Sequence, residues 1–211
     1  MIGRPARSLL FAFALLAPAE TLDRIAVTVG RYVISEQDLM RDIRVSAFLD
    51  GKDADLSAAA KRKAAERLVD QYLVLQDALE TRAVLATADG VAGLLAPIKA
   101  RYANDEEYRA ALIKARITEP DLQSTLLAGL RMLRYTDVRF RPQMQVSEEG
   151  LRAYYEALVA GNPGAPARSF EESRADVEKL LTDQQTMQSL DDWLKMMRSE
   201  IAIVYRDAVF K

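Results

Sequence analysis

Along most of the chain, apolar residues recur at the three- and four-residue spacing of an amphipathic helix. Such stretches begin near positions 35, 57, 87, 105, 118, 147 and 169. Ser35 and Ser169 each precede an acidic residue at the third following position, which is the pattern of a capping box. Two segments, 24–34 and 201–205, are instead rich in β-branched residues. The pattern therefore predicts a mostly α-helical fold with a small β-sheet.

The first β-rich segment has the features of a hairpin. Gly30 and Arg31 separate two short runs, and glycine at the first position of a two-residue connection favours a tight turn. A two-stranded hairpin is only marginally stable by itself in water, so it needs a further partner. Because the segment 201–205 is the other β-rich run, we expect one small sheet to join the two ends of the domain.

Residues 1–19 have the composition of a secretory signal peptide. Two arginines precede the apolar run 9–16, and residues 17–19 supply a small-residue cleavage site. The alternative is a buried N-terminal helix, but the prolines and the placement of the charges favour export. The apolar run is shorter than the roughly 20 residues that span a bilayer. We therefore expect a cleaved signal, a periplasmic protein and no stable membrane insertion.

The composition excludes most familiar catalytic chemistries. The chain has 211 residues and contains neither histidine nor cysteine, so it has no Ser-His-Asp triad, no cysteine nucleophile and no ordinary zinc or haem site. Adjacent acidic residues occur at 106–107, 148–149, 171–172 and 191–192. Adjacent residues do not share a helix face, however, and three of these pairs fall in predicted first helical turns. We predict no catalytic residues, no metal site and no cofactor.

Four arginines lie at positions 131, 134, 139 and 141, beside two aromatic residues. One interpretation is contact with nucleic acid or an anionic membrane, and the other is the favourable placement of cations near the end of a helix. The formal net charge of the chain is −2, which favours the second interpretation. We therefore predict no nucleic-acid partner.

Taken in order, these elements resemble the N-terminal (SurA N-like) domain of the SurA-type periplasmic chaperones, which is related in fold to the chaperone domain of trigger factor. Residues 22–39 are similar to the family's opening hairpin and first helix, and residues 67–76 to its central helix. Residues 117–122 and 146–155 are also similar, and residues 170–205 resemble its C-terminal helix and strand. The resemblance implies that the C-terminal strand returns to pair with the N-terminal hairpin.

The chain departs from this family at one place. In full-length members, one or two parvulin-type prolyl isomerase domains lie between the last two helices. Here only residues 160–169, rich in glycine and proline, separate residues 20–159 from residues 170–211. We expect residues 20–211 to form a single chaperone domain in which this linker replaces the parvulin domain.

The resemblance implies an ATP-independent chaperone, or holdase, that binds unfolded or extended segments of envelope proteins such as outer-membrane precursors. One alternative is a protein related to peptidyl-prolyl isomerases, against which the absence of histidine and of a parvulin-sized insert weighs. The other is an assembly factor for a single envelope partner. The candidate peptide-binding residues lie mainly on the irregular middle helices, and each can equally be a core residue. They are Leu95, Ile98, Tyr102, Tyr108, Leu112 and Met132.

Overall fold

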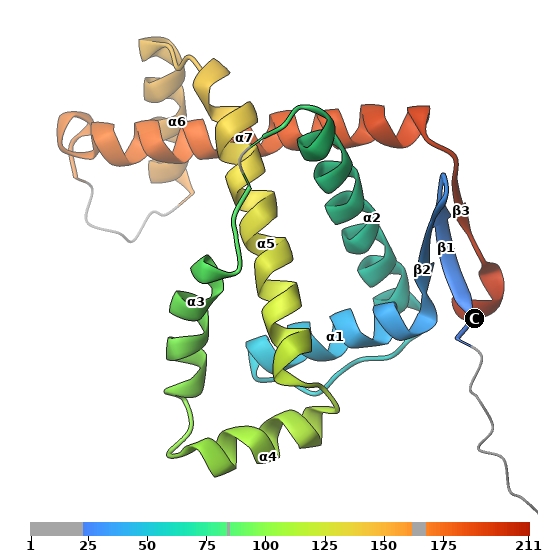
Figure 1. The fold of residues 1–211 in the computed structure, drawn as a ribbon. Coiled ribbons are helices and arrows are strands. Elements are labelled where there is room, and N and C mark those ends of the chain that lie inside the picture. Colours follow the sequence, from blue (N-terminus) through green and yellow to red (C-terminus); the bar gives the residue numbers. More distant parts are fainter. Residues whose placement is uncertain (1–22, 84, 162–167) are drawn as a thin grey trace, which may run out of the picture.

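The computed structural model describes residues 23–83, 85–161 and 168–211. The predicted signal peptide, 1–19, lies outside these residues, as does most of the predicted linker, 160–169. The described fold is mostly helical with a small antiparallel sheet, which confirms the predicted fold class (Figure 1). The strands are β1 (Ile25–Val29), β2 (Tyr32–Ser35) and β3 (Ile203–Tyr205). The helices are α1 (Glu36–Asp50), α2 (Ala58–Glu80), α3 (Asp89–Lys99), α4 (Asp105–Ala115), α5 (Glu119–Arg139), α6 (Glu148–Ala160) and α7 (Phe170–Glu200), with short 3-10 turns at Arg141–Gln143 and Asp207–Val209.

The sheet brings together segments from near the two ends of the described chain. Its strand order is β2-β1-β3, so the N-terminal hairpin and the C-terminal strand form one sheet as expected. Val27 of β1 pairs with Ile34 on one side and with Tyr205 on the other. Gly30 has a φ of +56° in the hairpin turn, a left-handed conformation that glycine adopts without steric cost. The third strand gives the hairpin the support that it lacks by itself.

Capping boxes start three of the helices. Ser35, Thr118 and Ser169 each accept a hydrogen bond from the backbone N–H three residues later, and the acidic side chain at that position accepts one in return. These bonds satisfy backbone donors that have no partner inside the helix. They also fix the acidic side chains of Asp38 and Asp121 at the first turns of α1 and α5, which matters for the pocket described below.

Two hydrophobic cores stabilise the molecule. The first core lies under the sheet, where β1, β2, α1 and α2 meet the C-terminal ends of α5 and α7. Leu39, Leu73, Tyr135 and Trp193 are among its buried residues. The second core lies between α3 and α4, and is completed by the C-terminal half of α1 and the start of α5. In Figure 1, α5 runs between α2 on one side and α3 on the other.

The helix α6 packs against the N-terminal half of α7, away from the sheet (Figure 1). The Tyr155 hydroxyl donates a hydrogen bond of 2.7 Å to the Arg168 carbonyl, and an Arg174–Glu148 ion pair of 2.7 Å joins the two helices. From this contact α7 continues to the sheet, so one helix of 31 residues links both regions. Within the described ranges, no helix combines the length and the apolar character needed to cross a membrane.

Candidate binding pocket

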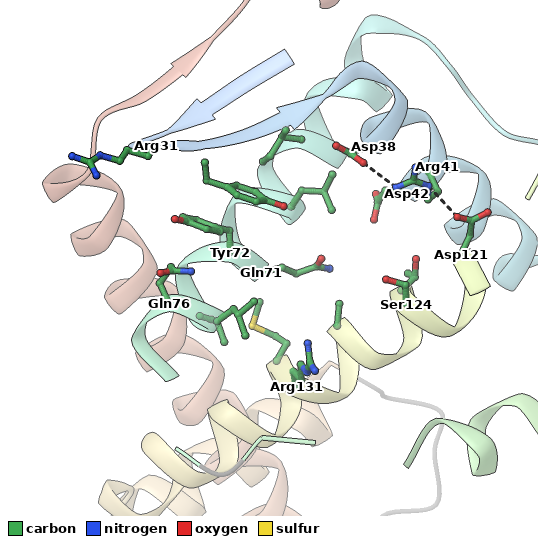
Figure 2. Close-up of a pocket in the computed structure, with 18 residues that line it drawn as sticks. Arg31, Asp38, Arg41, Asp42, Gln71, Tyr72, Gln76, Asp121, Ser124 and Arg131 are labelled. Carbon is green, nitrogen blue, oxygen red and sulfur yellow. Dashed lines mark hydrogen bonds and ion pairs between the residues drawn. The ribbon is translucent and has the colours of Figure 1, made fainter. Parts of the chain in front are cut away.

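A pocket of about 590 Å³ lies where β2, α1, α2 and α5 meet (Figure 2). Its volume is within the range of about 300–1,000 Å³ that is common for ligand sites. Its lining is divided between apolar side chains, an ion-pair cluster and polar side chains. Because the four elements come from three separated stretches of sequence, only the folded chain forms this pocket.

Apolar side chains from α2 and α5 line one part of the pocket. Leu68, Tyr72 and Leu75 follow one another at helical spacing on α2, and Met132 faces them from α5. The Tyr72 ring stacks on that of Tyr32 from β2, with ring centroids 4.2 Å apart and an angle of 7° between the planes. Burial raises the pKa of Tyr32, and the nearby Asp38 carboxylate adds to this effect. A flat aromatic wall beside aliphatic and thioether groups suits varied apolar side chains.

An ion-pair cluster forms another part of the lining. Arg41 bridges two carboxylates, with its Nη1 2.9 Å from Asp38 Oδ1 and its Nε 3.0 Å from Asp121 Oδ1 (Figure 2). Both carboxylates belong to capping boxes, so the helix starts hold them in place. Burial acts to raise the pKa of Asp121, but hydrogen bonds from the Thr118 hydroxyl and backbone lower it overall. The cluster therefore joins α1 to α5 through two ion pairs that share the Arg41 guanidinium.

Asp42 adds a buried carboxylate to this cluster. Only 5% of the residue is exposed, and its side chain pairs with the guanidinium of Arg67 on α2. Burial raises the pKa of Asp42, while the charge and the hydrogen bond of Arg67 oppose that rise. This pair joins α1 to α2, so the three helices around the pocket are linked by ionic contacts as well as by packing.

Several polar side chains in the lining are available to a ligand. Gln71, Gln76, Ser124 and Thr125 form no side-chain hydrogen bond with any other part of the described structure. Figure 2 shows the amide of Gln71 extending toward the centre of the pocket. Amide and hydroxyl groups can each donate and accept hydrogen bonds, which is what an extended peptide backbone requires.

The pocket is chemically suited to binding. It combines apolar surface with unused hydrogen-bonding groups, as ligand sites commonly do. The chain offers no histidine or cysteine for acid–base or nucleophilic chemistry. Across the described residues, no group of three or more acidic side chains is placed to hold a metal ion.

No protein-family model and no curated protein matches this chain.

The structure places the six predicted peptide-binding residues in two different regions. Met132 lines the pocket. Leu95, Ile98, Tyr108 and Leu112 are buried in the second core, outside the pocket lining. Tyr102 packs against that core, with its ring centroid 6.2 Å from that of Phe48. The structure therefore does not bring the six together, and only Met132 belongs to the pocket.

Most of the residues that line the pocket were not predicted from the sequence. The signal that could have found them is on α2, where Gln71 and Gln76 interrupt the apolar face formed by Leu68, Tyr72 and Leu75. Glutamines within an apolar helical stripe are unusual for a face that is fully buried in a core. The contributions from β2 and α5 depend on tertiary structure and leave no local pattern.

Proposed function

We propose that this protein is a periplasmic, ATP-independent chaperone that holds extended or unfolded segments of envelope proteins. The observation that carries the proposal is the pocket between β2, α1, α2 and α5, which combines apolar surface with unused hydrogen-bonding groups. An unfolded client exposes apolar side chains and unpaired backbone amides at the same time. A site that offers partners to both can hold such a segment without chemistry or nucleotide.

The arrangement of the chain supports the same proposal. In the resemblance to the SurA-type chaperones, the N-terminal hairpin and the C-terminal strand belong to one sheet, and the structure has such a sheet. Helix α6 ends at Ala160 and helix α7 begins at Phe170, so the segment between them is too short for a parvulin-type domain. This supports a chaperone module that works without an isomerase domain. The periplasmic location follows from the proposed signal peptide.

The test is a measurement of light scattering. A urea-unfolded outer-membrane β-barrel protein is diluted into buffer without ATP, with and without the chain from residue 20 onward. This chain contains every described residue. We expect near-stoichiometric amounts to keep the client in solution, because bound segments cannot associate with one another. No suppression for several unrelated clients would exclude a general chaperone and favour a factor for one partner, which a single stable complex in a pull-down would identify.

A matched pair of variants connects that activity to the pocket. Leu75 lines the pocket, whereas Leu79 lies one turn later on α2 with 63% of its surface exposed and is not part of the lining. Leu75→Gln is expected to weaken the suppression of aggregation, because it removes apolar surface from the site. Leu79→Gln is the control and should behave like the unmodified protein. Equal activity of the two variants would show that the clients bind elsewhere.

A further inference from the structure

We propose that the pocket prefers extended segments that carry an acidic residue, whose carboxylate binds Arg131 on α5. This inference rests on the proposed function and specifies the kind of client segment that the pocket selects. It depends on the position of Arg131, on the distribution of charge within the pocket and on the pocket's length.

Arg131 is held in a position from which it can bind an anion. Its Nε lies 3.4 Å from the Ala86 carbonyl oxygen, toward which it donates, and this leaves the two terminal nitrogens for a ligand. In Figure 2 the side chain rises from α5 toward the pocket. No acidic side chain lies within ion-pair distance of Arg131 in the part of the chain that the structure describes. A guanidinium with two parallel donors matches the geometry of a carboxylate.

The other charges of the pocket lie elsewhere. Arg31 is at the hairpin turn, and Figure 2 shows its side chain directed away from the other lining residues, while the remaining charged side chains of the lining are paired. Arg41 pairs with Asp38 and Asp121, and Asp42 pairs with Arg67. Asp121 and Arg131 are ten residues apart on α5, which corresponds to about 15 Å along the helix axis. That separation exceeds the Debye length of roughly 8 Å at physiological ionic strength, so the acidic cluster only weakly offsets the charge of Arg131. Arg131 and the ion-pair cluster around Arg41 therefore mark two separate ends of the pocket: within the described residues, the first carries an unpaired cation and the second carries paired charges.

The separation of these ends fits an extended peptide. A strand rises about 3.3 Å per residue, so about 15 Å accommodates four or five residues. The lining also includes the apolar side chains of Leu68 and Leu75, and Figure 2 shows the amide of Gln71 extending toward the middle of the pocket. A segment whose acidic residue binds Arg131 would place its neighbouring apolar residues against this middle part of the pocket.

The experiment measures fluorescence anisotropy with labelled peptides of extended, mainly apolar sequence that differ at one central position. We expect the peptide with glutamate to bind about tenfold more tightly than the peptide with glutamine, because a charge-assisted hydrogen bond is lost with the amide. Raising the salt concentration should reduce this difference, since the new contact is ionic. Equal affinities for the two peptides would overturn the inference while leaving the proposed function intact. A lack of binding by either peptide would overturn both.

A matched pair of arginine variants locates the preference. Arg131→Gln is expected to bind the two peptides equally, because the charge that distinguishes them is gone. Arg134 lies on the same helix, is exposed and does not line the pocket, so Arg134→Gln is the control and should keep the preference. Circular dichroism verifies that both variants are folded. The comparison of the two peptides on the unmodified protein is independent of whether either variant folds. If Arg131→Gln keeps the preference for glutamate, the assignment to Arg131 is wrong.

Discussion

The two hydrophobic cores differ in which parts of the chain they require. The first core combines the N-terminal hairpin with the C-terminal end of α7, so residues from both ends of the described chain must be present. The second core comes mainly from the contiguous stretch between Val91 and Leu122, with Val45 and Phe48 added from α1. The first core therefore determines whether the domain exists as a unit, whereas the second stabilises a largely local arrangement.

The two cores also differ in whether their buried tyrosine hydroxyls are hydrogen-bonded. In the first core, the Tyr135 hydroxyl donates a hydrogen bond of 2.6 Å to Asp77 Oδ2, and Arg139 lies 3.3 Å from the same oxygen. In the second core, the buried Tyr108 hydroxyl has no hydrogen-bond partner among the described residues. A buried polar group without a partner lowers stability. The first core thus satisfies its buried polar groups more completely than the second.

The largest effect is expected from Trp193→Ala in the first core. The Trp193 ring lies 5.5 Å from that of Tyr135 and 6.2 Å from that of Phe140, measured between centroids. Its removal leaves a cavity that neighbouring side chains cannot fill, at a cost of about 3–5 kcal/mol in the free energy of unfolding. Urea denaturation followed by circular dichroism measures this loss. A variant that loses under 1 kcal/mol would show that the ring is not central to the core.

A smaller and more local effect is expected from Leu112→Ala in the second core. The cost should be near the lower end of the roughly 2–5 kcal/mol typical of such changes. Trp193 is the chain's single tryptophan and lies in the first core, so its fluorescence reports on that core only. We expect the circular dichroism of Leu112→Ala to change at lower urea concentration than the fluorescence does. Coincident curves would instead show that the two cores unfold together.

The tyrosine pair gives the finest comparison. Tyr135→Phe should lower the free energy of unfolding by about 1.5–3 kcal/mol, because it removes the hydrogen bond that the Tyr135 hydroxyl donates to the Asp77 carboxylate. Tyr108→Phe is its matched control and should change stability by under about 0.5 kcal/mol, or raise it, since no hydrogen bond is lost. Chemical denaturation at neutral pH measures both. A larger loss for Tyr108→Phe than for Tyr135→Phe would reverse the comparison.

The same control variant has a distinct dependence on pH. Burial, together with the charge of Glu119, raises the pKa of Tyr108 from 10.0 to about 12. Between these values the unfolded chain releases the proton while the folded chain retains it, so the contribution of Tyr108 to stability falls as the pH rises from 10 to 12. The stability of Tyr108→Phe relative to the unmodified protein should therefore increase across this window. A constant difference would show that the hydroxyl titrates normally.

Much of the fold could be predicted from local patterns. Ser35 and Ser169 indicated helix starts that the structure has, and the capping chemistry that determines them joins residues only three positions apart. Gly30 indicated the hairpin turn, because the left-handed conformation that the turn requires is a property of that one residue. The sheet that joins both ends was predictable because a hairpin needs support and the chain has a further β-rich run near its end.

The pocket was much less predictable. The periodicity of α3 and α4 shows that Leu95, Ile98 and Leu112 face something apolar, but a core and a binding groove produce the same pattern. Only the tertiary structure shows that these residues close the second core. The pocket instead takes side chains from β2, α1, α2 and α5, and no spacing within the sequence indicates that these elements meet.

The central position of β1 has a consequence for the timing of folding. Synthesis and export proceed from the N-terminus, so β1 can pair with β2 early, whereas residues 203–205 emerge only after α1 to α7. Until then one edge of β1 is open, and an open edge can pair with strands of other molecules. A protein proposed to protect unfolded clients thus passes through an interval in which its own central strand is exposed, and that interval ends only when β3 pairs with β1.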